Sequence, residues 1–506
     1  MESQAAQFDR EGQRSRPVTR RTFLRGTVLT AGAVTGLGTV GSAAVAAPGA
    51  TSASVVYDAI VVGGGLSGLA AAKSLAEAGA SVVVLEARER AGGRVHNITS
   101  PILGATIDAG AEFIGPTQGH ISALADEYRV RSIPTYNAGD SLFWFDGSGR
   151  RMPAAVPVPA TLATLEATPA LVRAQADALA FPAGEPWKHP DAGYLDSITW
   201  GQYTDQLTSS PMARVLTTVA MSAPLSVRPD EVSALYVLNY IAASGDEHNP
   251  GSLMRLLSTE GGAQERLFEG GAALIPLRMA EALGNRMVYN APVRSITTGS
   301  GPAAVATDVG IFHGRKVVVA MSPAISGRIR YSPGLPESRI GLTRGYHMGA
   351  VSKFTAFYDQ PFWREQGMSG QVFGNGKPID VTFESYAEGR HILMGFISAD
   401  AMRRLDRAPE DQLVSECIGN FVDYFGPRAA EFIDYGVFKW DLEPWSLGGP
   451  VAVSSPGTLT KYGPALREPV GDIYWAGTET ADYWTGYMDG AVRSGRRAAF
   501  EVLTAQ

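Results

Sequence analysis

The sequence is poor in several features, and each shortage excludes a class of protein. Its 506 residues include a single cysteine, Cys417, which excludes an intramolecular disulfide and a cysteine-built metal site. Its seven histidines show no ligand spacing such as HExxH, so a metal enzyme is disfavoured. Its net charge of −7 argues against a nucleic-acid-binding protein, because such proteins gather lysine and arginine.

What remains is the composition of an ordinary globular protein, with 45% hydrophobic and 18% charged residues. The length is enough for two or three domains, since single hydrophobic cores stop growing at about 250–300 residues. The sequence shows no internal repeat, and the Pro-rich stretch MPAAVPVPA at residues 152–160 is typical of a connecting loop.

The N-terminus has the features of an export signal. Arg20 and Arg21 precede Phe-Leu and a glycine- and threonine-diluted apolar stretch to about Ala47, with an A-x-A cleavage site at 44–46. The stretch is too weakly apolar for a membrane span, which needs about 20 strongly apolar residues. We therefore expect residues 1–50 to be a twin-arginine signal outside the fold, and the protein to be periplasmic or secreted. A basic leader without export is the alternative.

The next stretch, YDAIVVGGGLSGLAAAKSLAEAGASVVVLE, predicts a dinucleotide-binding unit. Residues 57–62 are a short, continuously apolar strand, and Gly63, Gly65 and Gly68 follow as GxGxxG. A helix pattern then runs to Gly79, and a second strand, 81–85, ends at Glu86. In such units the three glycines permit the tight turn, the approach of a pyrophosphate and close helix–strand packing, and the acid accepts a ribose hydroxyl. The helix N-terminus favours the phosphates.

The segment after Glu86 indicates which dinucleotide is bound. ARERAGGR adds Gly92, Gly93 and Arg94, a second close backbone approach beside a cation. With these residues the stretch resembles the signature of the flavin-dependent amine oxidase superfamily, which binds FAD. The resemblance covers nearly everything from about residue 55 to the end, and it is closest to the monoamine oxidases and their bacterial relatives.

Four further segments carry the resemblance: IDAGAEFIGPTQ, LFEGGAALIPLRMAEALGNRMVYNAPVRSI, GAVSKFTAFYDQPFW and DIYWAGTETADYWTGYMDGAVRSGRRAAF. It implies that Lys353 lies beside the flavin N5, where it orients a water molecule, and that Trp484 and Tyr487 belong to the reaction site. It also implies helix amides at Met488 that face the flavin N1–C2 edge. The expected FAD contacts are Gly63, Gly65, Ser67, Gly68, Glu86, Arg88, Gly93, Arg94, Gly110, Ala111, Glu112, Phe113, Val293, Gly477, Glu479, Tyr487 and Met488.

The chain departs from the monoamine oxidases at two neighbouring positions. Pro450 replaces the cysteine that links FAD in those enzymes, so we expect FAD to be bound non-covalently. Val451 replaces one of two facing aromatic rings, while Tyr487 keeps the other. The expected substrate pocket, Phe113, Val451, Trp484 and Tyr487, is therefore wider and should admit bulkier or secondary amines. DAGAEFIG lacks an arginine for a carboxylate, which disfavours amino-acid substrates.

The implied fold is α/β, with a Rossmann-like FAD-binding domain and a discontinuous α+β substrate domain, as in monoamine oxidases. We expect the FAD domain to comprise residues 55–135, 262–345 and 440–506. The substrate domain would comprise 136–261 and 346–439, with helices at 161–180 and 229–244 and a strand at 350–359. Cys417 is expected to be buried in an amphipathic helix.

The expected reaction is the FAD-dependent oxidation of a primary or secondary amine to an imine, which water converts to a carbonyl compound and an amine or ammonia, with O2 reduced to H2O2. Three alternatives remain open: a dehydrogenase that passes electrons to a cytochrome or quinone, a C–C desaturase or amino-acid oxidase on the same fold, and a non-enzymatic flavin module. A homodimer is expected from the family, and no nucleic-acid partner is expected.

Overall fold

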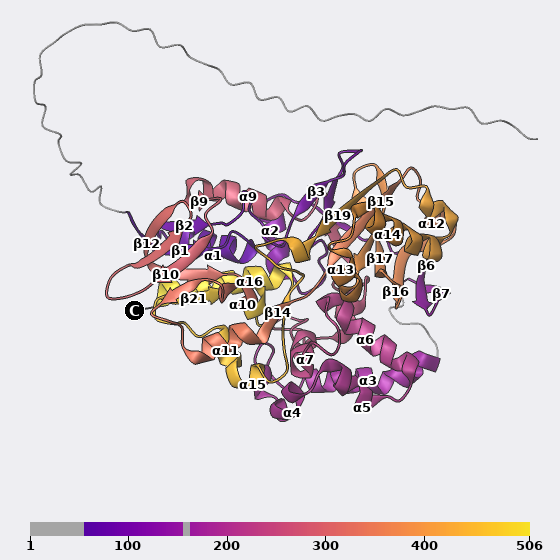
Figure 1. Ribbon diagram of the computed structural model, residues 1–506, viewed down its shortest axis with the longest axis horizontal. Coiled ribbons are helices and arrows are strands. Elements are labelled where there is room, and N and C mark those ends of the chain that lie inside the picture. The colour runs from indigo at the N-terminus through magenta and orange to yellow at the C-terminus, as the bar shows by residue number, and fades with distance from the viewer. Residues whose placement is uncertain (1–54, 155–161, 506) are drawn as a thin grey trace, which may run out of the picture. The chain divides into compact units, whose positions relative to one another are not determined.

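The apolar stretch before the glycine motif forms strand β1 (Val56–Val62), which pairs in parallel with two neighbours in an eight-stranded sheet (Figure 1). The structure, a computed structural model, describes residues 55–154 and 162–505. The order in this sheet is β13 (Arg330–Ser332), β10 (Val293–Thr297), β11 (Ala303–Thr307), β12 (Gly310–Ala320), β1, β2 (Val82–Leu85) and β9 (Met287–Val288), and β21 (Ile473–Ala476) also pairs with β12.

Two long helices cover this sheet because glycines let them approach closely. A Cβ at Gly68 would lie 1.9 Å from the carbonyl oxygen of Gly63, and one at Gly495 would lie 2.1 Å from that of Ser67. Only glycine fits at such distances. The elements brought together are α1 (Leu66–Glu77) and α16 (Met488–Thr504), which share one buried core with α2 (Gly119–Glu127) and α9 (Leu274–Leu283).

A second, seven-stranded sheet is antiparallel apart from one parallel pair, β6 with β16. Its order is β19 (Asp434–Lys439), β15 (Ser352–Tyr358), β18 (Arg390–Ile397), β17 (Ile379–Ala387), β16 (Met368–Gly374), β6 (Asp140–Phe145) and β7 (Ser148–Pro153). Its helices are α12 (Phe362–Glu365), α13 (Ala399–Leu405) and α14 (Glu410–Phe425). Cys417 of α14 is fully buried in the core of this sheet, as expected.

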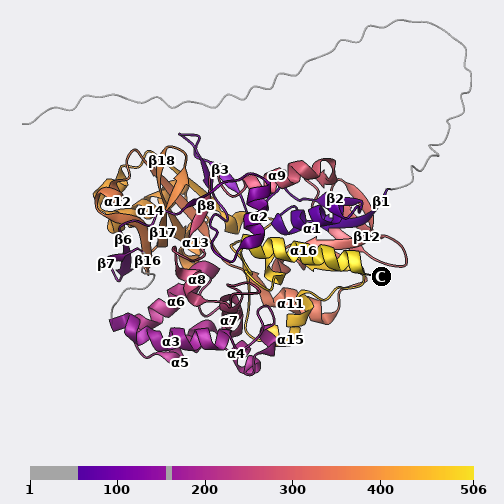
Figure 2. The ribbon, with the colours of Figure 1, turned by 180° about the vertical axis from the view of Figure 1, so that it is seen from behind.

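Helices α3 to α7 lie together on one side of the molecule in both ribbon views (Figure 2). The helices of this layer, with α8, are α3 (Leu162–Ala178), α4 (Ala192–Ser197), α5 (Trp200–Leu207), α6 (Pro211–Leu225), α7 (Ala234–Ala242) and α8 (Leu253–Leu257). The predicted helices at 161–180 and 229–244 correspond to α3 and α7, and the predicted strand at 350–359 corresponds to β15.

The remaining elements connect these parts. Short strand pairs are β3 (Asn97–Thr99) with β4 (Thr106–Asp108), β5 (Ser132–Pro134) with β8 (Arg266–Phe268), and β14 (Tyr346–Met348) with β20 (Ala452–Ser454). Short helices are α10 (Pro323–Ser326), α11 (Glu337–Gly345) and α15 (Leu459–Tyr462). Turns of 3₁₀ helix lie at Pro186–Lys188, Gly284–Arg286, Pro427–Ala430, Trp440–Leu442, Gly463–Leu466 and Thr478–Thr480.

The predicted domain segments can be compared with the sheets. The eight-stranded sheet takes its strands from 55–135, 262–345 and 440–506, and the seven-stranded sheet takes its strands from 136–261 and 346–439. Residues 54–506 nevertheless form one compact unit. The predicted leader and most of the predicted Pro-rich loop lie outside the described residues. In the described part of the chain, no helix combines the length and the apolar character that a bilayer crossing requires.

Candidate active site

A single elongated cavity of about 730 Å³ is lined by both sheets and by the helical layer. One end is made by β1, β2 and β10, and the other by α3, α6 and α8 together with β16, β17 and β18. Most of the predicted site residues line it, namely Gly63, Gly65, Ser67, Glu86, Arg88, Gly93, Arg94, Gly110, Ala111, Glu112, Phe113, Val293, Lys353, Gly477, Tyr487 and Met488.

The glycine motif forms the first end of the cavity. Gly63 has a φ of +106°, which only glycine adopts readily, and it turns the chain from β1 into α1. Gly65 precedes α1 without a side-chain cap, and a Cβ there would meet no protein atom closer than 3.9 Å. Gly68 does not line the cavity, because its role is the packing of α1 described above. The first turn of α1 thus offers free amides and open space to a phosphate.

Glu86, the acid predicted to bind the ribose, lies beside this turn. Its carboxylate is buried and accepts the amides of Gly64 at 2.6 Å and Arg88 at 2.9 Å. The Arg88 guanidinium in turn pairs with Glu443 and donates to the Ser446 hydroxyl at 2.8 Å. Each of the two Glu86 carboxylate oxygens is therefore held in place by a backbone amide.

Arg94, which lines the cavity, forms a bidentate ion pair with Glu479. Arg94 donates to the two Glu479 oxygens at 2.7 and 3.2 Å and to the carbonyl of Pro450 at 2.9 Å. Glu479 also accepts the amide of Ala452 at 3.1 Å, and it does not line the cavity. The Glu479 carboxylate is thus engaged in holding Arg94, and its contact with FAD stays a prediction.

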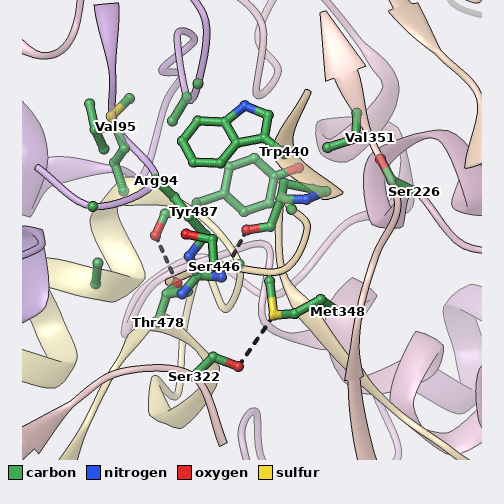
Figure 3. A pocket seen from close by; sticks show the side chains of 18 of the residues that line it. Arg94, Val95, Ser226, Ser322, Met348, Val351, Trp440, Ser446, Thr478 and Tyr487 are labelled. Atoms are coloured by element: carbon green, nitrogen blue, oxygen red, sulfur yellow. Dashed lines mark hydrogen bonds between the residues drawn. The ribbon is translucent and has the colours of Figure 1, made fainter. Parts of the chain in front are cut away.

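Helix α16 begins at the cavity, as predicted. Its N-cap, Tyr487, makes no side-chain cap, and the Tyr487 carbonyl accepts the Thr478 hydroxyl at 2.8 Å. Figure 3 shows Arg94, Thr478 and Tyr487 converging from separate segments. Gly477, with a φ of +124°, donates its amide to the Ser67 hydroxyl at 2.8 Å and so connects the turn before α16 to α1.

These features fit FAD. Two helix N-termini without side-chain caps, those of α1 and α16, open on one cavity, and a buried acid stands beside the first of them. The α1 terminus would hold the pyrophosphate and Glu86 the ribose, while the α16 terminus would face the flavin. The cavity is lined by Val293, by the glycine turn before α1 and by the first residue of α16, the segments expected to contact the two halves of the dinucleotide.

Lys353, the second residue of β15, lines the cavity. Its ammonium lies 2.5 Å from a Glu112 carboxylate oxygen and donates to the Asp108 carbonyl at 3.2 Å. Both side chains of the ion pair are nearly fully buried. Gly110, Ala111 and Phe113 follow along the same wall, whose backbone is fixed by a 2.8 Å hydrogen bond from Trp440 to the carbonyl of Ala109.

Two of the predicted pocket residues do not line the cavity. Val451 is fully buried in the core beneath Gly486, and Trp484 is buried behind Tyr487, with ring centroids 4.8 Å apart. The Trp484 indole donates to Thr117 at 3.1 Å, which explains why it faces away from the cavity. Trp484 therefore packs against Tyr487, and a direct contact of Trp484 or Val451 with substrate stays a prediction.

Sequence reasoning missed several aromatic residues that line the cavity, among them Tyr240 and Trp440. Tyr240 comes from α7, and its ring lies 5.8 Å from that of Tyr487. It thus supplies a second ring where Val451 removes one. Every residue of α7 is buried, so no polar–apolar pattern singles out Tyr240 in the sequence. Burial raises the pKa of Tyr487 to about 12, so this phenol stays neutral near pH 7.

The far end of the cavity is apolar. Its side chains come from eight helices and strands and include Phe143, Met152, Leu171, Leu216, Leu256, Phe373, Phe383 and Phe396. Within the described residues, the two carboxylates that line the cavity are Glu86 and Glu112, and both are already hydrogen-bonded within the protein. This end can therefore hold a hydrocarbon or aromatic body but offers no free acid.

Comparison with known proteins places this geometry in a family. The model of the flavin containing amine oxidoreductases matches residues 66–503. The chain belongs to this family. It is 37% identical to AofH of Mycobacterium tuberculosis, a predicted flavin-containing monoamine oxidase, over 88% of this chain and 96% of that protein. It is 33% identical to human amine oxidase [flavin-containing] B, over 88% and 86% of the two chains.

Solved structures agree with this assignment. Putrescine oxidase bound to putrescine superposes with a TM-score of 0.84 at 30% identity, over 89% of this chain and 99% of that one. Cyclohexylamine oxidase from Brevibacterium oxydans gives 0.83 at 32% identity, over 88% and 99%. The predicted two-domain amine-oxidase fold, the predicted FAD cofactor and the predicted oxidation of amines are thus confirmed. The enzyme is an FAD-dependent amine oxidoreductase.

Proposed function

We propose that the enzyme oxidises an apolar primary or secondary monoamine. The observation that carries this proposal is the far end of the cavity, which is lined by aliphatic and phenyl side chains and whose wall presents no free carboxylate among the described residues. A diamine would leave its second ammonium without a counter-ion there. Leaving a buried charge unpaired costs about 3–5 kcal/mol. A monoamine with an apolar substituent avoids that cost, because it places no second ammonium at this end of the cavity.

The residues that line the cavity would select the neutral form of the amine and orient its nitrogen. An apolar wall disfavours the ammonium form and lowers the pKa of the bound amine, so the neutral base is selected. The rings of Tyr240 and Tyr487 stand close together at the flavin end, where they would guide the nitrogen. FAD, when bound, accepts the electron pair and hydrogen lost from the amine α-carbon. The resulting imine is hydrolysed to a carbonyl compound and an amine or ammonia.

A panel of amines tests this choice. We expect benzylamine, hexylamine or an N-methylated analogue to yield the carbonyl product, and putrescine to be a poorer substrate by roughly 10²- to 10³-fold in kcat/KM, the equivalent of the unpaired charge. Equal rates with putrescine and hexylamine would contradict the monoamine assignment without affecting the assignment to the family.

For the electron acceptor we propose O2, with H2O2 as product and a water molecule oriented by Lys353. The support is the position of Lys353, which lines the cavity beside Phe113 and Trp440. A Lys353→Met variant should still be reduced by amine but reoxidise more slowly in air. Rapid reoxidation by a cytochrome or quinone, together with slow reoxidation by O2, would instead favour a dehydrogenase.

We propose that FAD is held without a covalent bond. The sole cysteine, Cys417, is fully buried in α14 and does not line the cavity, while Pro450 lines it at the position where the monoamine oxidases carry their cysteine. Acid precipitation should therefore release the yellow colour into the supernatant. Colour retained in the pellet would contradict this proposal.

For localisation we propose export by the twin-arginine route, supported by Arg20-Arg21 and the A-x-A site. A protein that folds around FAD in the cytoplasm needs a route that carries folded cargo. A fusion of residues 1–50 to a folded reporter should reach the exported fraction, and a fusion with both arginines changed to lysine should not. The family favours a homodimer, which sedimentation of the flavin-loaded protein would test.

A further inference from the structure

Lys353 depends for its charge on a partner from outside its own sheet. On β15 it is paired with Phe396 of β18 on one side and Phe438 of β19 on the other. Its ammonium also lies 5.7 and 6.0 Å from the ring centroids of Phe396 and Phe113. Desolvation by such neighbours disfavours a charged lysine and can lower its pKa by about 3–5 units.

Glu112 supplies the missing counter-charge. In the described part of the chain it is the one carboxylate that forms an ion pair with Lys353, and its second oxygen accepts the hydroxyl of Ser385 from β17. The side chains of Glu112 and Lys353 are 1% and 6% exposed, so solvent screens the pair weakly. The lysine is held at a fixed point by three elements: its own strand, the loop after β4 and β17.

One further titratable group faces this pair. The carboxyl of Asp108 accepts the amide of Ala272 at 2.8 Å. Burial and then the nearby charge of Glu112 raise the pKa of Asp108 well above the ordinary value, although Lys353 opposes this shift. Burial therefore favours the neutral, protonated form of Asp108, which makes it a weaker competitor than Glu112 for the Lys353 ammonium.

We propose that Glu112 is a positioning residue for this reaction, which keeps Lys353 as a cation with its Nζ fixed at the flavin end of the cavity. The inference rests on the proposed function only in placing Lys353 beside the flavin. It adds that the protein holds the lysine charge through Glu112 and Ser385, so that the ammonium keeps its charge and its place beside the flavin.

The test is the pH dependence of the flavin midpoint potential, measured by reductive titration with mediators and without any amine. In Glu112→Gln, Lys353 loses its counter-ion while its apolar neighbours remain, so its ammonium should give up a proton within the pH range of the titration. This adds an inflection to the plot of potential against pH, beyond any that Asp108 gives in wild type. The double variant Glu112→Gln/Lys353→Met should lose the added inflection, because the titrating amine is gone.

A matched control exists on β17. Glu384 is also buried, and it accepts the Trp363 indole at 2.7 Å and the Arg364 guanidinium at 2.8 Å, at a site that does not line the cavity. Glu384→Gln should leave the potential profile as in wild type. An unchanged profile in Glu112→Gln, or an added inflection that survives removal of Lys353, would overturn the proposal.

A second measurement does not require bound FAD, so it can be made even if Glu112→Gln binds FAD poorly. Only a neutral amine reacts with acetic anhydride, so the rate of Lys353 acetylation at pH 7, followed by peptide mass spectrometry, reports its protonation. We expect at least a tenfold faster reaction in Glu112→Gln than in wild type, with other lysines as internal references. Equal rates would overturn the proposal. Neither readout requires amine oxidation, so failure of the substrate assignment and failure of this inference are distinguishable.

Discussion

The substitution Gly65→Ala separates cofactor binding from folding. Gly65 has an extended φ of −76° and ψ of 174°, which alanine adopts without strain, and the added methyl would meet no protein atom within 3.9 Å. Alanine is a poorer N-cap than glycine, which costs up to about 1 kcal/mol. It also restricts the unfolded chain, which stabilises the fold by about 0.4–1 kcal/mol. The apoprotein should therefore be about as stable as wild type.

FAD binding should suffer, because the methyl occupies the space through which a phosphate reaches the first turn of α1. Losing one or two hydrogen bonds to a charged group costs about 1.5–3 kcal/mol each. This corresponds to a weakening of the FAD dissociation constant of roughly 10- to more than 100-fold. Gly68→Ala provides the contrast, since its methyl would lie 1.9 Å from the Gly63 oxygen and should destabilise even the apoprotein.

The assay combines thermal unfolding of the apoproteins with titration of FAD, followed by quenching of flavin fluorescence. The expected pattern is an unchanged apoprotein melting temperature with weak FAD binding for Gly65→Ala, and a lowered melting temperature for Gly68→Ala. Wild-type FAD affinity in Gly65→Ala would refute the placement of the pyrophosphate over α1.

Further predictions concern the pH dependence of stability, the packing of Trp484 behind Tyr487, and the ion pair between Arg94 and Glu479. Burial, and then Arg90 and Arg88, lower the pKa of His96 to about 4, so the unfolded state takes up a proton first and the free energy of unfolding should fall as pH drops from 6.5 to 4. Urea titrations should show a weaker fall for His96→Gln. Trp484→Phe removes the indole hydrogen bond behind Tyr487 and should lower kcat/KM by about tenfold with little loss of FAD, which spectral titration would check. Arg94→Met leaves the Glu479 carboxylate buried without its partner and should cost about 3–5 kcal/mol of stability in urea unfolding, whereas Arg94→Met/Glu479→Gln should recover most of it.

The parts of the fold and site that follow from the sequence are those determined by local backbone geometry. Gly63 needs a positive φ, Gly68 needs the absence of a Cβ, and Glu86 ends a strand beside the helix that they begin. Each requirement is met within about 25 residues of chain, so the motif predicts the first half of the site directly. The start of α16 at Met488 is similarly local.

What the sequence does not determine is the direction of side chains from distant elements. Glu479 and Trp484 stand in a motif that lines the cavity, yet their side chains turn away to Arg94 and Thr117. Tyr240 faces the cavity from a helix that is buried all round. The pairing of Glu112 with Lys353 joins residues 241 positions apart. Such contacts depend on how the sheets and helices meet, which periodicity does not report.

The central claim is that FAD lies along this cavity and takes electrons from an apolar amine at its far end. Its most direct test is anaerobic titration of the flavin-loaded enzyme with hexylamine or benzylamine, followed by the blue absorption of the flavin. We expect loss of the oxidised flavin spectrum at about one equivalent of amine per flavin, with stoichiometric carbonyl product. A flavin that no apolar amine reduces, or that only diamines reduce, would contradict it.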